Sequence, residues 1–338
     1  AQARADVARM PLDRQVGQLL IVAFRGTSAP DYVLDALHDG RVAGAILFGA
    51  NAPTAGSVRG LTARLRAAAR ASGPPPIVCL DQEGGAIRTL RFAPSVAGQA
   101  AQPTPAAARA AASATGHALR RLGVNVVLGP VADVAAGTSG SVMASRAYPG
   151  GAPAVAASVR AATQAYLRAG VLPVVKHFPG LGGATANTDD ATVRVSRTRT
   201  QLRADLASFQ AGFAAGAPLV MLGHARYPTL DPARIASQSH AIANELLRDE
   251  LGFDGVAMTD SLEAQAVLAS SGGDVGAAAV RSLRAGADLM LMTGPGSFPL
   301  VRDALVRQAQ RSPAFHTRLL QAAARVLALR RARLSSTG

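Results

Sequence analysis

The sequence predicts a single-domain α/β protein, a (β/α)8 TIM-type barrel with a C-terminal helical extension. Three observations lead to this prediction. The length of 338 residues suits one barrel of this kind. Short apolar runs bounded by glycine and proline alternate with alanine-, leucine- and arginine-rich stretches of helical period. Polar side chains gather directly after the apolar runs, where the active sites of such barrels lie.

The apolar runs are short enough to be buried strands of a parallel sheet. We expect strands at 18–24, 44–48, 77–80, 124–128, 172–175, 219–222, 256–258 and 289–292. The helices expected between them lie near 31–38, 55–71, 104–122, 152–169, 199–214, 240–250, 262–285 and 297–309. Strand then helix repeated eight times closes a parallel barrel.

The end of the chain carries one more arginine-rich helical stretch, at about 312–333. We expect it to pack outside the barrel or to cover its bottom. No linker-like segment divides the chain. The expected organisation is therefore a barrel over 1–310 and a C-terminal helix and tail packed on it over 311–338.

Composition excludes several classes of protein. Hydrophobic residues make up 49% and charged residues 17% of the chain, which argues against intrinsic disorder. A single cysteine, Cys79, rules out an internal disulfide, and no apolar run is long enough to predict a membrane span.

The net charge of +14 would ordinarily suggest a nucleic acid partner. The arginines are spread along the chain, however, and aromatic residues amount to only 4%, so we expect no nucleic acid binding. Lys176 is the one lysine among the basic residues, and a compact ammonium at a tight site is not interchangeable with a guanidinium.

The sequence begins at Ala1, and its first residues lack the apolar stretch of a signal peptide. We expect that a preceding segment was removed. The compartment stays open between an exported or cell-envelope protein and a cytoplasmic one, and a monomer is expected.

Polar residues follow almost every expected strand. They are Asn51 after the second strand, Asp81 and Glu83 after the third, Asp133 and Arg146 after the fourth, Lys176 and His177 at the end of the fifth, His224 at the end of the sixth and Asp260 at the end of the seventh. These polar residues predict an active site at the carboxyl ends of the strands.

Asp260 allows two interpretations. With Glu263 three residues later it resembles a capping box at a helix start. Alternatively its carboxylate points into the barrel mouth, where it could attack an electrophilic carbon or hold a cation.

Lys176 and His177 offer two adjacent donors that suit a polyhydroxylated ligand or an oxyanion. Asp81 and Glu83 fall on one side of an extended stretch by period-two alternation. Because His177 and His224 follow different strands without a metal-binding spacing, we expect no catalytic metal, and no cofactor is implied.

Six segments in order resemble a known family: CLDQEGG, GVNVVLGPVADV, ASRAYPG, VVKHFPGLG, MLGHARYPTLDP and ELGFDGVAMTDSLEA. They are similar to the single-domain β-N-acetylglucosaminidases of glycoside hydrolase family 3, over about residues 17–310. The resemblance implies a (β/α)8 barrel and a retaining mechanism with Asp260 as nucleophile. It also implies that sugar hydroxyls in subsite −1 are bound by Asp81, Arg146, Lys176 and His177, with His224 lining that subsite.

Two segments depart from the family pattern. After KHFPG the family continues with His-Gly and then an Asp-Ser-His whose Asp-His pair is the general acid/base. In this chain an ungapped alignment places Asn187 at that aspartate and Asp189 at that histidine. After DQEGG, Ala86 and Thr89 replace the family's two arginines, with Arg88 one position early.

Retaining hydrolysis needs a nucleophile and an acid. We predict Asp189 as the general acid/base, with Asp190 as the substitute candidate, because burial and the nearby charge of Asp260 would raise the pKa of Asp189. The predicted function is a retaining hydrolase of β-linked N-acetylglucosaminides or β-glucosides, acting through a covalent glycosyl-aspartate in cell-wall or glycan turnover. The alternative is a catalytically impaired carbohydrate-binding barrel.

Overall fold

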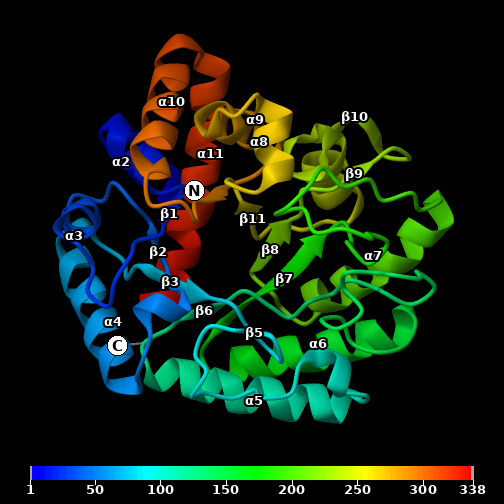
Figure 1. The fold of residues 1–338 in the computed structure, drawn as a ribbon. Helices are drawn as coiled ribbons and strands as arrows, with labels where there is room; N and C mark the ends of the chain where they lie inside the picture. The colour runs from blue at the N-terminus through cyan, green and yellow to red at the C-terminus, as the bar shows by residue number, and fades with distance from the viewer. Residues whose placement is uncertain (1, 336–338) are drawn as a thin grey trace.

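The computed structural model describes residues 2–335, which form a closed barrel of eight parallel strands surrounded by helices (Figure 1). Around the barrel the strands run in the order β1, β12, β11, β8, β7, β6, β3 and β2. Their bounds are β1 Leu20–Val22, β2 Gly44–Ile46, β3 Ile77–Leu80, β6 Val126–Val127, β7 Leu172–Phe178, β8 Leu219–Leu222, β11 Val256–Ser261 and β12 Leu289–Leu291. Because β1 pairs with both β2 and β12, the eight-stranded sheet closes on itself, and the predicted fold class is confirmed.

Alternate residues of the strands fill the barrel interior. Cys79 and Met221, for example, belong to one apolar cluster with Ile21 and Val174. Their neighbours, such as Val78 and Val220, belong to the second and larger cluster, which includes the surrounding helices. Successive residues of a strand point alternately into the barrel and toward the helices. Because both of these faces are buried, the strands appear in the sequence as continuous apolar runs.

Helices cover the outside of the barrel, with α5 and α6 side by side below it in the view of Figure 1. The helices that follow the strands are α3 Asp31–His38, α4 Ala55–Ala69, α5 Pro105–Arg121, α6 Ala152–Arg168, α7 Arg199–Ala214, the π-helix η5 Ala241–Glu250, α8 Gln265–Ser271, α9 Val275–Ala285 and α10 Ser297–Arg311. Several begin at a threonine whose side chain accepts a hydrogen bond from a main-chain amide in the first turn, as Thr198 Oγ1 does from the Gln201 amide at 3.2 Å.

The loops between these elements contain short strands and 3-10 turns. The strands are β4 Gln82–Gly84, β5 Ile87–Arg88, β9 Arg226–Tyr227 and β10 Asp231–Ile235, and the turns are η1 Gly49–Asn51, η2 Arg70–Ser72, η3 Gln99–Ala101 and η4 Ala236–Gln238.

The single helix expected over 262–285 is wrong. The structure has two helices there, α8 and α9, separated by Gly272 and Gly273 with φ of +67° and +83°. Glycine adopts this left-handed backbone without a Cβ penalty, and Asp274 then caps α9 by accepting from the Ala277 amide at 2.9 Å.

The ends of the described chain pack together at the bottom of the barrel. Helices α1 Gln2–Ala8 and α2 Leu12–Gly17 precede the first strand and were not expected from the sequence. Helix α11 Pro313–Leu329 packs on α1, and the π-helix η6 Arg330–Leu334 follows it. Val326 and Leu334 join the cluster that contains Ile77 and Leu219, the first residues of their strands. The C-terminal helices therefore cover the amino ends of the strands and leave the carboxyl ends open.

Within residues 2–335, no helix has the length and apolar character that crossing a bilayer requires.

Candidate active site

A cavity of about 310 Å³ lies at the carboxyl ends of the barrel strands. Its floor is apolar and is made by the uppermost inward-facing residues Ile46, Leu128, Met221 and Leu291. Its other lining residues are Phe48, Asp81, Asp189, Asp260, Ser261, Glu263, Ala264 and Thr293. Four of these carry carboxyl groups, so the cavity has polar walls above an apolar floor.

Asp260 lies near the end of β11 and lines this cavity. Its Oδ1 accepts from the Ser261 amide at 2.8 Å, while α8 begins only at Gln265 and has no side-chain cap. The capping-box interpretation of Asp260 is therefore wrong. Burial alone would raise the pKa of Asp260, but the neighbouring charges of His177, His224 and Lys176 lower it below the ordinary value.

Asp189 comes to the same cavity because α8 holds its loop. The Gln265 amide donates to the Asp189 carbonyl at 3.0 Å, and the Ala266 amide donates to the Thr188 carbonyl at 3.1 Å. These are amides at the start of α8, which have no partners within the helix. Burial and then the charge of Asp260 raise the pKa of Asp189. Asp189 and the neighbouring Asp190 are both exposed to solvent, but only Asp189 is part of the cavity lining.

Lys176 is the centre of a buried cluster of charges. Its Nζ lies 2.5 Å from Asp81 Oδ1 and 2.7 Å from Glu83 Oε1. Arg146 binds the same Glu83 with two hydrogen bonds, at 2.7 and 2.9 Å. Burial would raise the pKa of Glu83, but the charge of Lys176 and the hydrogen bond from Arg146 lower it to about 2. The two cations and two carboxylates hold each other in place beside the cavity.

His177 is oriented by Asp133, whose carboxylate is fully buried. Asp133 Oδ2 lies 2.7 Å from Nδ1 of His177, and its Oδ1 accepts from the amides of His177 and Leu181 at 3.2 and 2.6 Å. A carboxylate only accepts, so Nδ1 donates the proton. The Nε2 atom faces Arg146 at 3.5 Å. Asp133 thus sets the ring of His177 and the start of the loop that carries Asp189.

His224 is buried between two partners. Its Nε2 lies 2.9 Å from the Ser261 carbonyl and its Nδ1 2.8 Å from Ser237 Oγ. Because a carbonyl only accepts, Nε2 carries the proton and Nδ1 accepts from the serine hydroxyl. Burial lowers the pKa of His224, although Asp260 opposes the shift. The ring therefore stands next to β11 and donates through Nε2 to the Ser261 carbonyl.

Asn51 is structural. Its Nδ2 donates to the carbonyls of Phe24 and Gly26 at 3.0 and 2.7 Å, and its Oδ1 accepts from the Phe48 amide at 2.8 Å. It fixes the loops that bring Phe48 to the cavity rim.

Glu263 is the site residue whose position the sequence did not predict. Its Oε2 accepts from the amide and hydroxyl of Thr293 at 2.8 and 3.1 Å. Its Oε1 is buried and has no hydrogen-bond partner within residues 2–335. Because the side chain lines the cavity, that oxygen can accept a hydrogen bond from a ligand hydroxyl. Only the closeness of Glu263 to Asp260 in the chain could have suggested this position.

A second cavity of about 780 Å³ shares Phe48 and Asp81 with the first. Phe92 and two arginines, Arg88 and Arg91, also line it. The barrel mouth therefore continues into a wider groove with an aromatic and cationic wall. Across residues 2–335, no group of three or more His, Cys, Asp or Glu side chains is arranged to hold a metal ion.

A barrel with paired carboxylates at its mouth is the architecture of many glycoside hydrolases. Residues 11–329 match the glycosyl hydrolase family 3 N terminal domain, and the chain belongs to this family.

Similar proteins carry related names. A beta-hexosaminidase of Xanthomonas oryzae pv. oryzae is 34% identical over 289 residues, which cover 82% of this chain and 84% of that protein. The structure of a family 3 beta-N-acetylglucosaminidase from a Paenibacillus species has a TM-score of 0.91 at 33% identity, and the match covers 97% of this chain but 64% of that one. A beta-N-acetylhexosaminidase from Beutenbergia cavernae has a TM-score of 0.86 at 34% identity, covering 96% of this chain and 99% of that one.

Proposed function

We propose that the protein is a retaining glycoside hydrolase that releases β-linked N-acetylglucosamine units, with Asp260 as nucleophile and Asp189 as general acid/base. One observation carries the proposal. Two carboxyl groups line the same cavity, and their surroundings move their pKa values in opposite directions, down for Asp260 and up for Asp189. Such a pair supplies an ionised nucleophile and a protonated acid at the same pH.

In the first step Asp260 attacks C1 of the sugar while Asp189 gives its proton to the glycosidic oxygen. The bond from C1 to that oxygen breaks, the alcohol leaves, and a glycosyl ester forms on Asp260. In the second step the Asp189 carboxylate takes a proton from water, the water oxygen attacks C1, and the ester bond to Asp260 breaks. Two inversions give net retention of the β configuration.

The charge cluster would orient the sugar. Lys176 and Arg146 would supply donors, His177 would meet a hydroxyl through its Nε2, and Asp81, which lines both cavities, would supply an acceptor. Their mutual ion pairs fix these groups before substrate arrives, so little ordering is needed in the transition state.

The choice of an N-acetylated sugar rests on the similar proteins, which are named as enzymes for N-acetylglucosaminides and N-acetylhexosaminides. The 310 Å³ cavity would hold the sugar that is released, and the adjoining 780 Å³ groove would hold the leaving group. Turnover of cell-wall glycan is the process that we propose for this activity.

The test is turnover of p-nitrophenyl N-acetyl-β-glucosaminide and of p-nitrophenyl β-glucoside, with the anomer first formed identified by proton NMR. We expect turnover of the N-acetylated substrate, formation of the β anomer first, and loss of activity in Asp260→Asn. Formation of the α anomer first would exclude the retaining mechanism. Tight sugar binding without turnover of either substrate would instead favour the carbohydrate-binding barrel.

A further inference from the structure

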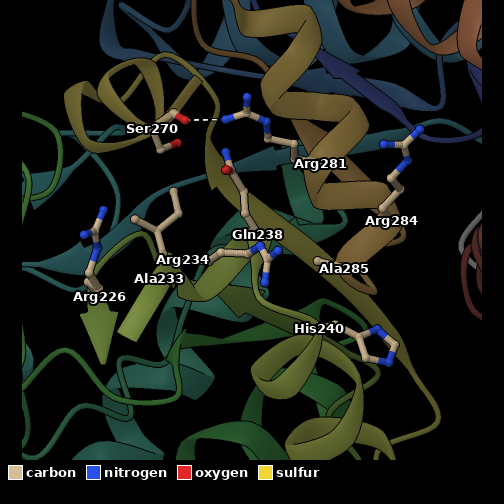
Figure 2. Close-up of a pocket in the computed structure, with 10 residues that line it drawn as sticks. Arg226, Ala233, Arg234, Gln238, His240, Ser270, Arg281, Arg284 and Ala285 are labelled. Carbon is tan, nitrogen blue, oxygen red and sulfur yellow. Dashed lines mark hydrogen bonds between the residues drawn. The ribbon is translucent and has the colours of Figure 1, made fainter. Parts of the chain in front are cut away.

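A third cavity, of about 530 Å³, shares no lining residue with the two cavities of the barrel mouth (Figure 2). It lies among β9, β10, η4, α8 and α9. Its lining consists of Arg226, Ala233, Arg234, Ile235, Gln238, His240, Ser270, Arg281, Arg284 and Ala285. Four of these residues are arginines and one is a histidine, and none carries a carboxyl group.

The guanidinium groups are not neutralised inside the cavity. Arg281 donates to the main-chain carbonyl of Ser270, which carries no net charge. Arg284, one helical turn away on α9, lies over the ring of Phe315 with its Cζ 5.7 Å from the ring centre. Neither contact neutralises an arginine charge, and Figure 2 shows the Arg281 guanidinium directed toward Ser270 and the Arg284 guanidinium directed away from it.

The other two arginines are also poorly paired. The Nε of Arg226 is buried and has no hydrogen-bond partner among the described residues. Arg234 approaches Asp231 only at 3.9 Å, and the Asp231 carboxylate already accepts from Ser239 Oγ at 2.7 Å and from the Ala233 amide at 2.9 Å. The cavity therefore has a surplus of positive charge and unused donors.

Gln238 adds a neutral donor to this set. The residue is only 6% exposed, and its Nε2 has no hydrogen-bond partner among the described residues. Figure 2 shows its amide directed into the space beside Arg281 and Ser270. A buried amide without a partner is costly, and a bound acceptor would satisfy it.

We propose that this cavity binds a phosphate-bearing anion, of the size of a diphosphate or a phosphorylated sugar. Donors reach the cavity from β9, β10, η4 and α9, so they surround a ligand instead of meeting it in one plane. A tetrahedral phosphate offers three acceptor oxygens in different directions and about two negative charges, whereas a carboxylate accepts in one plane with one charge. The volume exceeds that of one phosphate group, which explains the choice of a larger ligand.

Isothermal titration calorimetry of the full chain with inorganic pyrophosphate tests this proposal. We expect saturable binding at one site per chain, unaffected by saturating N-acetylglucosamine. Sodium glucuronate at equal ionic strength should bind at least tenfold more weakly. Absence of saturable binding, competition by N-acetylglucosamine, or equal affinity for glucuronate would overturn the proposal.

Two variants and one control locate the site. Arg234→Gln changes a side chain that is 65% exposed, so the fold should survive, and it should weaken pyrophosphate binding severalfold. Adding Arg281→Gln should weaken it further, by at least tenfold relative to the parent chain. Arg64→Gln removes the same charge from an exposed position of α4, a helix on the opposite side of the molecule in Figure 1, and should bind like the parent. Equal loss in the control and in Arg234→Gln would show only a general charge effect and would refute the site.

Discussion

Lys176 Nζ lies 2.7 Å from Oε1 of Glu83, and both side chains are only 2% exposed. The pair joins β7 to the segment that follows β3, and these two strands are separated in the barrel by β6. A buried charge that loses its partner costs far more than the intact pair contributes. The site therefore depends on these two residues being ionised together.

Glu83→Gln should lower the free energy of unfolding by about 3 kcal/mol at neutral pH, because Lys176 and Arg146 lose a shared carboxylate. The pKa of Glu83 is lowered to about 2 in the folded protein, so its stabilising effect exists above the ordinary value of 4.5 and is lost as the pH falls toward 2. Urea titrations at several pH values measure the effect. The difference between parent and variant should shrink on acidification.

Glu245→Gln on η5 is the control for this experiment, since Glu245 is exposed. It should change the unfolding free energy by less than about 0.5 kcal/mol. A constant deficit for Glu83→Gln from neutral to acid pH would contradict the assigned ionisation.

The pH dependence of kcat/KM should be bell-shaped, because the free enzyme needs Asp260 ionised and Asp189 protonated. Burial would raise the pKa of Asp260, but His177, His224 and Lys176 lower it below its ordinary value. The acidic limb of the profile should therefore lie below the ordinary range of an aspartate. The pKa of Asp189 is raised by burial and by Asp260, and places the alkaline limb above it. Initial rates with an aryl N-acetylglucosaminide across the pH range measure both limbs.

Asp189→Asn should abolish the alkaline limb and lower kcat/KM by about 10² to 10⁴ for substrates with poor leaving groups. The loss should be smaller for a dinitrophenyl glycoside, whose leaving group needs little protonation. The loop should keep its place, because α8 holds the main-chain carbonyl of Asp189 and not its side chain. Azide, which needs no general base, should accelerate release of the sugar as a β-glycosyl azide.

Asp190→Asn is the matched control, since Asp190 is an exposed aspartate of the same loop, as Asp189 is, but lies outside the cavity lining. It should retain the parent activity within a factor of a few. If Asp190→Asn shows the loss and the azide rescue expected of Asp189→Asn, the acid/base role belongs to Asp190.

The barrel could be predicted from sequence because each strand is buried on both faces and therefore reads as an apolar run. The rim residues could be predicted because the ends of those runs mark the carboxyl ends of strands. The position of Asp189 is harder to predict from the sequence. It depends on hydrogen bonds that the amides of Gln265 and Ala266 donate to a loop more than seventy residues earlier in the chain. The basic cavity was beyond sequence reasoning, because its arginines lie on separate elements and follow no motif.

The capping-box interpretation gives Glu263 the wrong position because residues 261–264 do not begin a helix. The chain crosses from β11 to α8 in an irregular turn, and Glu263 turns back to Thr293. The helical spacing assumed from the sequence therefore gave the wrong direction for its side chain.

Gly294→Ala tests the role of Glu263 without changing its charge. A Cβ at Gly294 would lie 3.0 Å from Glu263 Cγ, 3.1 Å from its Oε1 and 3.0 Å from Ser297 Oγ, so these side chains must shift by a few tenths of an ångström. If Oε1 accepts from a sugar hydroxyl, the loss of that bond should raise KM by about tenfold, with a smaller change in kcat. Gly296→Ala is the control, since its Cβ meets nothing within 4 Å and its φ of −94° suits alanine. Equal KM values for the two variants would show that Glu263 does not contact the sugar.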